Sequence, residues 1–78
     1  MRQTHNTLTN ERVWITNVSR KQHRYVVGTS SKSFIWIAPA KHRDLLETLY
    51  CYCDSIRINA TTSRKNGFNT LTEVEILN

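Results

Sequence analysis

Short runs of basic residues and histidines recur at three places in the sequence. They hold seven of the eleven Lys and Arg residues and two of the three histidines: Arg20, Lys21, His23 and Arg24; Lys41, His42 and Arg43; and Arg64 and Lys65. We call these runs the first, second and third basic clusters. Lys and Arg side chains bind phosphate groups through charge and donated hydrogen bonds, and a nearby histidine can contact phosphate or transfer protons. The residue types therefore predict a site for a polyanion.

The charge of the chain is strongly positive and unevenly spread. The net charge is +5. Residues 1–43 hold eight Lys or Arg residues against one acidic residue, whereas residues 44–78 hold three against five. A small basic protein of this kind most often binds nucleic acid, a membrane surface or an acidic protein face. Because no apolar run is long enough to span a bilayer, we expect no membrane partner.

The small size of the chain argues against an enzyme. A chain of 78 residues forms one small core, which leaves few side chains to enclose a catalytic cleft. A remote alternative is a metal-independent ribonuclease in which His23 and His42 act as acid and base. Cys51 and Cys53 are too few for a structural zinc site, so we expect no metal and no cofactor. The N-terminal residues lack the apolar core of a signal peptide, which predicts a cytoplasmic protein.

The hydrophobic pattern predicts one small α+β domain at residues 12–78, preceded by a flexible polar arm at residues 1–11. Segments rich in β-branched and aromatic residues indicate strands, and Pro39 followed by a helical spacing of leucines indicates a helix. In chain order the expected elements are strands at 12–19, 24–30 and 33–38, a helix at 39–53, and strands at 55–63 and 68–77. We expect the first three strands to form an antiparallel meander, the last two to form a hairpin, and the helix to pack on the sheet.

The turn between the last two strands has two interpretations. A two-residue Asn66-Gly67 turn is the commonest hairpin signal. If the two strands pair without interruption from that turn, however, each face of the hairpin mixes apolar and charged residues. A three-residue loop at residues 65–67 instead aligns Ile58 with Val74 and leaves one face apolar. The sorting of the faces favours the three-residue loop.

The order of the elements brings the three basic clusters to one end of the molecule. The first cluster lies at the first turn, the second at the start of the helix, and the third at the last turn. If the helix runs antiparallel to the third strand, all three points lie together. We therefore expect the nine residues of the three clusters to form one nucleic-acid-binding end.

Aromatic residues of the first three strands give a second signal. With turns centred on residues 21–22 and 31–32, one face carries Trp14, Tyr25, Phe34 and Trp36. The opposite face is aliphatic, with Val13, Ile15, Val26, Ile35 and Ile37, and suits the helix. One helix cannot cover both faces. The aromatic face is then either a platform that stacks bases or contacts a protein partner, or part of the core, or a homodimer interface.

These observations favour a small nucleic-acid-binding protein that holds phosphates at its basic end. DNA and RNA are not distinguished, because no sequence signature of a known reading motif is present. The alternative is a small inhibitor or adaptor, of a viral or mobile-element type, that binds an acidic or nucleic-acid-binding surface of a protein partner. Charge alone does not separate the two, because both partners require the same basic patch.

Overall fold

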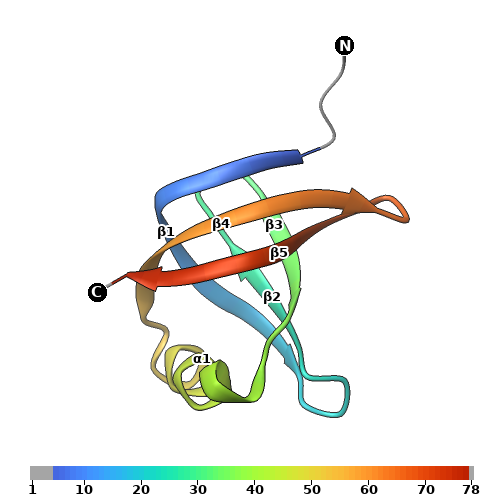
Figure 1. The fold of residues 1–78 in the computed structure, drawn as a ribbon. Helices are drawn as coiled ribbons and strands as arrows, with labels where there is room; N and C mark the ends of the chain where they lie inside the picture. Colours follow the sequence, from blue (N-terminus) through green and yellow to red (C-terminus); the bar gives the residue numbers. More distant parts are fainter. Residues whose placement is uncertain (1–4, 78) are drawn as a thin grey trace.

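Five strands and one helix make up the part of the chain that the structure, a computed structural model, describes, residues 5–77 (Figure 1). The elements are β1 (His5–Ser19), β2 (Arg24–Gly28), β3 (Ser33–Ile37), α1 (Ala40–Tyr52), β4 (Ser55–Lys65) and β5 (Phe68–Leu77). The predicted order β-β-β-α-β-β and the α+β class are confirmed. The helix agrees with its predicted bounds to one residue at each end.

The five strands form one closed barrel, in which the order of neighbours is β1-β2-β3-β5-β4. The long strand β1 pairs with β4 over residues 5–14 and with β2 over residues 14–19. All pairings are antiparallel except that of β3 with β5, which is parallel and runs through one residue pair, Ile35 with Thr70. The predicted meander and hairpin are therefore both present, and this parallel pair joins them. We call the junction of β3 and β5 the seam.

Helix α1 lies at one end of the barrel (Figure 1). Its buried residues, Leu46 and Leu49, extend the core that fills the barrel. Pro39 directly precedes the helix, where its missing N–H costs no hydrogen bond, and Cys53 ends it in a left-handed conformation. No helix within residues 5–77 is long and apolar enough to cross a membrane.

The aromatic rings of β2 and β3 point into the barrel, so the prediction of an aromatic face free for stacking is wrong for Tyr25, Phe34 and Trp36. Their exposed fractions are 2%, 5% and 6%. Burial also raises the pKa of the Tyr25 hydroxyl. Trp14, the fourth predicted ring, is half-buried and lies over Gly28, where an added Cβ would be 2.9 Å from its Nε1. Of the three interpretations of these rings, the core is the correct one for those of β2 and β3.

A β-bulge in β1 explains why the faces were assigned incorrectly. Ile15 pairs with Val27 and Asn17 pairs with Val26, so Thr16 is an additional residue between them. Side chains alternate strictly only in an uninterrupted strand, and a bulge exchanges the faces. Val13 and Ile15 therefore share the interior with the aromatic rings, and Ile35 and Ile37 face outward. The helix does not cover those two isoleucines.

The β4–β5 turn is the two-residue Asn66-Gly67 turn, and the preference for a three-residue loop is corrected. Lys65 pairs directly with Phe68. The faces are sorted further along, where Thr72 is an additional residue on β5 and brings Ala60 opposite Val74. The hairpin does need one apolar face, as expected. The bulge at Thr72 produces that face, and the length of the turn does not.

The predicted flexible arm is corrected for residues 5–11. They form the first half of β1 and pair with residues 58–63 of β4. A positive φ of 49° at Asn10 marks a second irregularity in β1, where the Asn10 N–H donates to the side chain of Asn59 over 2.8 Å. Residues 1–4 of the predicted arm lie outside the described residues.

Candidate functional site

A surface groove of about 450 Å³ runs beside the seam, between the β1–β2 turn and the β4–β5 turn. Its volume is within the range of roughly 300–1,000 Å³ that is usual for ligand sites. We call it the seam groove. Its lining residues are Gln22, Arg24, Ile35, Ile37, Lys65, Asn66, Phe68 and Thr70.

The apolar part of the seam groove comes from the outward positions of β3 and the first residue of β5. Phe34 and Trp36 point inward, so the alternation of a strand turns Ile35 and Ile37 outward. Ile37 is 61% exposed and Phe68 is 60% exposed. Large apolar side chains grouped at a concave site, with charged residues around them, are typical of a surface that a partner covers.

The β1–β2 turn forms one basic wall of the groove and lies against the segment that leads into α1. Within the turn, His23 adopts a left-handed conformation with φ of 55°, and its N–H donates to the Arg20 carbonyl over 3.3 Å. The His23 carbonyl accepts a hydrogen bond of 3.1 Å from the N–H of Ala38. This bond fixes the turn beside the start of the helix, and so brings the first and second basic clusters together.

The β4–β5 turn forms the opposite wall. Asn66 and Gly67 have φ angles of 53° and 83°, as a tight hairpin turn with two left-handed residues requires. This turn places Lys65 and Phe68 opposite each other at the end of the hairpin, where both line the groove. The third cluster therefore faces the first across the groove, through Lys65 on one side and Arg24 on the other.

The β4–β5 turn requires a residue at position 67 that tolerates a left-handed backbone, and this requirement can be tested. Replacing Gly67 by Ala is expected to lower the free energy of unfolding by about 1 kcal/mol, because a Cβ disfavours positive φ. A Cβ at this position would meet no atom within 4 Å, so the cost would come from the backbone alone. Urea denaturation of the variant measures it, and an unchanged midpoint would contradict the turn geometry.

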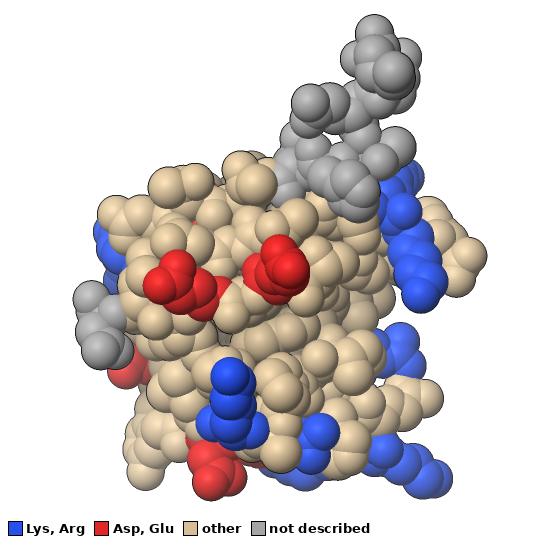
Figure 2. Space-filling view, viewed as in Figure 1, with Lys and Arg blue, Asp and Glu red and all other residues tan. Residues whose placement is uncertain are grey.

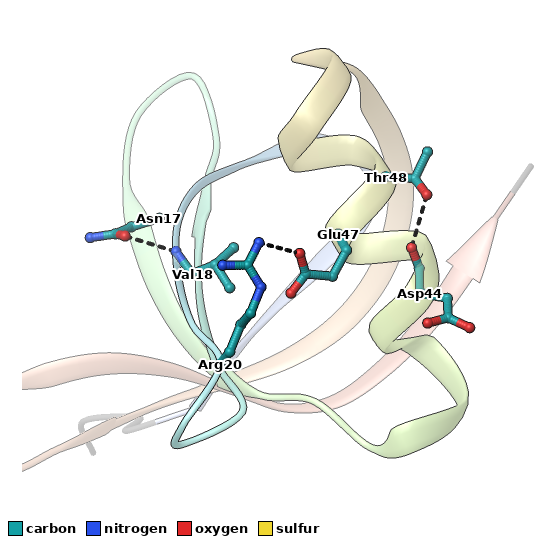
Figure 3. Close-up of polar contacts among 6 residues, drawn as sticks. All are labelled: Asn17, Val18, Arg20, Asp44, Glu47 and Thr48. Atoms are coloured by element: carbon teal, nitrogen blue, oxygen red, sulfur yellow. Dashed lines mark hydrogen bonds and ion pairs between the residues drawn. The ribbon is translucent and has the colours of Figure 1, made fainter.

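Arg20 does not line the seam groove but reaches from the β1–β2 turn to the helix (Figure 3). Its Nη2 lies 2.7 Å from Glu47 Oε1. The hydrogen bond and the charge of Glu47 raise the pKa of the Arg20 guanidinium. Nearby contacts in the same view, from the Val18 N–H to Asn17 and from the Thr48 hydroxyl to the Asp44 carbonyl, hold the flanking backbone. The ion pair thus connects the turn with α1. It also engages Arg20, one of the cations of the first cluster, with Glu47.

Removal of the Glu47 carboxylate should release Arg20 for other anions. Glu47→Gln is expected to raise the affinity for a single-stranded oligonucleotide about 5-fold at 0.1 M salt, the contribution of roughly one phosphate contact. Asp44→Asn makes the same change of net charge on the same helix without touching the ion pair. Equal gains for the two variants in a fluorescence-anisotropy titration would show that net charge alone is responsible.

The second basic cluster is partly engaged in structural contacts. Arg43 Nε donates to the Ala38 carbonyl over 3.1 Å, and the ring of His42 lies 5.9 Å from that of Trp36 between centroids. Both side chains are half-buried, whereas Lys41 is exposed. Lys41 is therefore the cation of this cluster that is best exposed to a partner.

The nine predicted site residues do not contribute equally to the groove. Figure 2 shows Lys and Arg along the side that carries the two turns and also over the helix, and acidic side chains on the face over β5 and also beside the helix. Arg24 and Lys65 line the groove; Lys21, His23 and Arg64 are exposed in or beside the turns. Arg20, His42 and Arg43 make the contacts described above. Arg24 and Lys65 meet at the groove, but β4 runs antiparallel to β1, so the strand directions from which the convergence of all three clusters was expected are corrected. Binding by the nine residues as one site stays a prediction.

Sequence reasoning missed most of the groove itself. Gln22, Ile35, Ile37, Asn66, Phe68 and Thr70 were not among the predicted site residues. The signal that could have identified Ile35 and Ile37 is the alternation in the segment "SFIWI", since the larger Phe and Trp fill the core better. Asn66, Phe68 and Thr70 have no local signal, because the parallel pairing of β3 with β5 brings them to the groove. Gln22 lies in the β1–β2 turn beside Arg24 and was missed because it carries no charge.

Comparison with known proteins finds no matching family model, no matching curated protein and no matching solved structure. Within residues 5–77, no group of three or more His, Cys, Asp and Glu side chains could hold a metal ion.

Proposed function

We propose that this protein binds single-stranded nucleic acid in the seam groove. The observation that carries the proposal is an apolar floor, formed by Ile37 and Phe68, between two walls that carry Arg24 and Lys65. Phosphates need cations, and the faces of bases need apolar or aromatic surface. A single strand offers both along its length.

A single strand fits this groove better than a duplex does. In a duplex the faces of the bases are stacked on each other, so they are not free to cover Phe68. Duplex-reading proteins commonly place a helix in the major groove. Here α1 is docked on the core through Leu46 and Leu49, and its exposed Asp44 would repel a phosphate.

The architecture gives independent support by analogy. A five-stranded Greek-key barrel is also the architecture of the OB-fold, in which the face of the second and third strands and the two loops that correspond to the β1–β2 and β4–β5 turns bind oligonucleotides and oligosaccharides. The seam groove lies between those same elements. A shared architecture does not by itself imply a shared function, so the analogy ranks below the side chains of the groove.

The alternative of an acidic protein partner loses one of its two expected anchors. An exposed Trp14 or Trp36 would favour such a partner, because tryptophan is enriched among residues that dominate protein interfaces, and Trp14 is half-buried. Trp36 is 6% exposed and lies in the core. The exposed aromatic residue of the groove is Phe68, whose ring suits the face of a base.

Phe68 gives the direct test of the proposal. Phe68→Ala is expected to weaken binding to a single-stranded oligonucleotide by about 5- to 100-fold, the usual contribution of one stacked base, without changing the salt dependence. Phe68→Trp should retain the affinity, because it keeps an aromatic face. Tyr52→Ala removes another exposed ring, which lies on α1 and outside the groove, and serves as the matched control.

Fluorescence anisotropy with labelled single strands and duplexes of equal length measures these effects over a series of salt concentrations. Wild-type protein that binds duplex as tightly as single strand would contradict the proposal. So would a Phe68→Ala variant that binds as tightly as the Tyr52→Ala control.

A further inference from the structure

Arg24 and Gln22 lie side by side in the seam groove, and their contact favours one orientation of the Gln22 amide. Arg24 Nη2 donates to Gln22 Oε1. Because a guanidinium group has no acceptor, the amide oxygen of Gln22 must be the atom that faces it. The amide NH₂ of Gln22, with its two donors, is then left for other partners.

The remaining polar side chains make the groove rich in donors. Arg24 and Lys65 can only donate hydrogen bonds. The Thr70 hydroxyl donates to the Ser63 carbonyl over 3.2 Å and lies 3.1 Å from the Ser63 hydroxyl, so it has no proton to donate to a ligand. Asn66 offers both a donor and an acceptor. Donors outnumber acceptors on both walls.

The four bases differ in the groups that would meet such donors. Guanine and thymine or uracil carry a keto oxygen at the position where adenine and cytosine carry an amino group. A keto oxygen accepts from the NH₂ of Gln22. An amino group presents a donor to a donor and leaves both without a partner, which costs affinity when water is excluded.

We propose that the seam groove prefers keto bases, guanine and thymine or uracil, over the amino bases adenine and cytosine, and that Gln22 sets this preference. The proposal rests on the proposed binding of single strands. It adds a specificity to that function, because phosphate contacts and stacking treat all bases nearly alike.

Thymine and cytosine oligonucleotides give the cleanest test, since they have equal charge and rings of equal size. The wild-type protein is expected to bind oligo-dT about 2- to 10-fold more tightly than oligo-dC of the same length, the net contribution of one hydrogen bond at an exposed site. Oligo-U against oligo-C in RNA should show the same ratio. The absolute affinities in the two series would identify the sugar that the groove accepts better, and a preference confined to the DNA series would assign it to the thymine methyl group and overturn the role of the keto oxygen.

Two substitutions assign the preference to Gln22, which is exposed in a turn and outside the core. Gln22→Leu removes the donors, so the ratio of dT to dC affinity should fall to about one. Gln22→Glu replaces the NH₂ by an acceptor oxygen and should favour dC. Ser31→Glu brings the same change of charge at the other end of β2 and should weaken both oligonucleotides alike, leaving their ratio unchanged.

The outcomes separate this inference from the proposed function. Equal, salt-dependent binding of dT and dC by the wild-type protein would overturn the keto preference and leave single-strand binding intact. A preference that persists in both Gln22 variants would overturn the role of Gln22. Absence of binding to every oligonucleotide would overturn both the inference and the function on which it rests.

Discussion

Replacing Lys21, Arg24 and Lys65 together by Gln is expected to weaken single-strand binding about 100-fold at 0.1 M salt. Each phosphate neutralised on a single strand contributes a slope of about −0.7 to the dependence of log affinity on log salt. Three lost contacts remove a slope of about 2, which amounts to that factor at 0.1 M. The three residues lie on the two walls of the seam groove or in the turn that forms one of them.

A matched set of charges outside the groove provides the control for this prediction. Arg12 lies on β1, where its Nε donates to Ser55 Oγ over 2.9 Å, and Lys32 and Arg57 lie outside the groove lining as well. Their joint replacement by Gln makes the same change in net charge. If it lowers the affinity and the salt slope as much as the groove variant does, the binding is a property of net charge and not of the seam groove.

The two phenylalanines of the chain are expected to respond in opposite ways to the same substitution. Phe34 is 5% exposed within the barrel, and Phe34→Ala should cost about 3–5 kcal/mol of unfolding free energy, since it leaves a cavity in the core. That loss approaches the whole stability of a domain of this size. Phe68 is 60% exposed, and Phe68→Ala should change stability by less than about 0.5 kcal/mol.

Urea denaturation followed by circular dichroism measures both variants. The pair separates folding from binding, because Phe34→Ala should lose affinity only in proportion to the unfolded fraction, whereas Phe68→Ala should lose affinity while it remains folded. A stability loss of several kcal/mol in Phe68→Ala would show that this ring belongs to the core. A stable Phe34→Ala would contradict the packing of the barrel.

Local sequence patterns predicted the elements well, and the reason is visible in the helix. Pro39 and the spacing of Leu46 and Leu49 act within a few residues of each other, so the sequence alone indicates where α1 begins and which side it buries. The Asn66-Gly67 turn carries an equally local signal, but the expected sorting of the faces outweighed it and led to the wrong three-residue loop.

Bulges and pairings between distant residues could not be predicted in this way. Thr16 and Thr72 each shift a strand by one residue and exchange its faces, yet neither has a side chain that distinguishes it from other strand threonines. The pairing of Ile35 with Thr70 joins residues that are far apart in the chain. The basic walls of the site were predicted because charge is read directly from sequence, and the apolar floor was missed because it depends on these shifts.

The seam also bears on how the barrel moves. Everywhere else the strands are held by several consecutive pairs, but at the seam a single pair connects β3 to β5. Separation of these two strands therefore breaks the fewest backbone hydrogen bonds of any junction in the barrel, and local opening has its lowest free energy where contacts are fewest. The two walls of the groove belong to the two sides of that junction. The width of the groove can thus change at little cost to the rest of the fold.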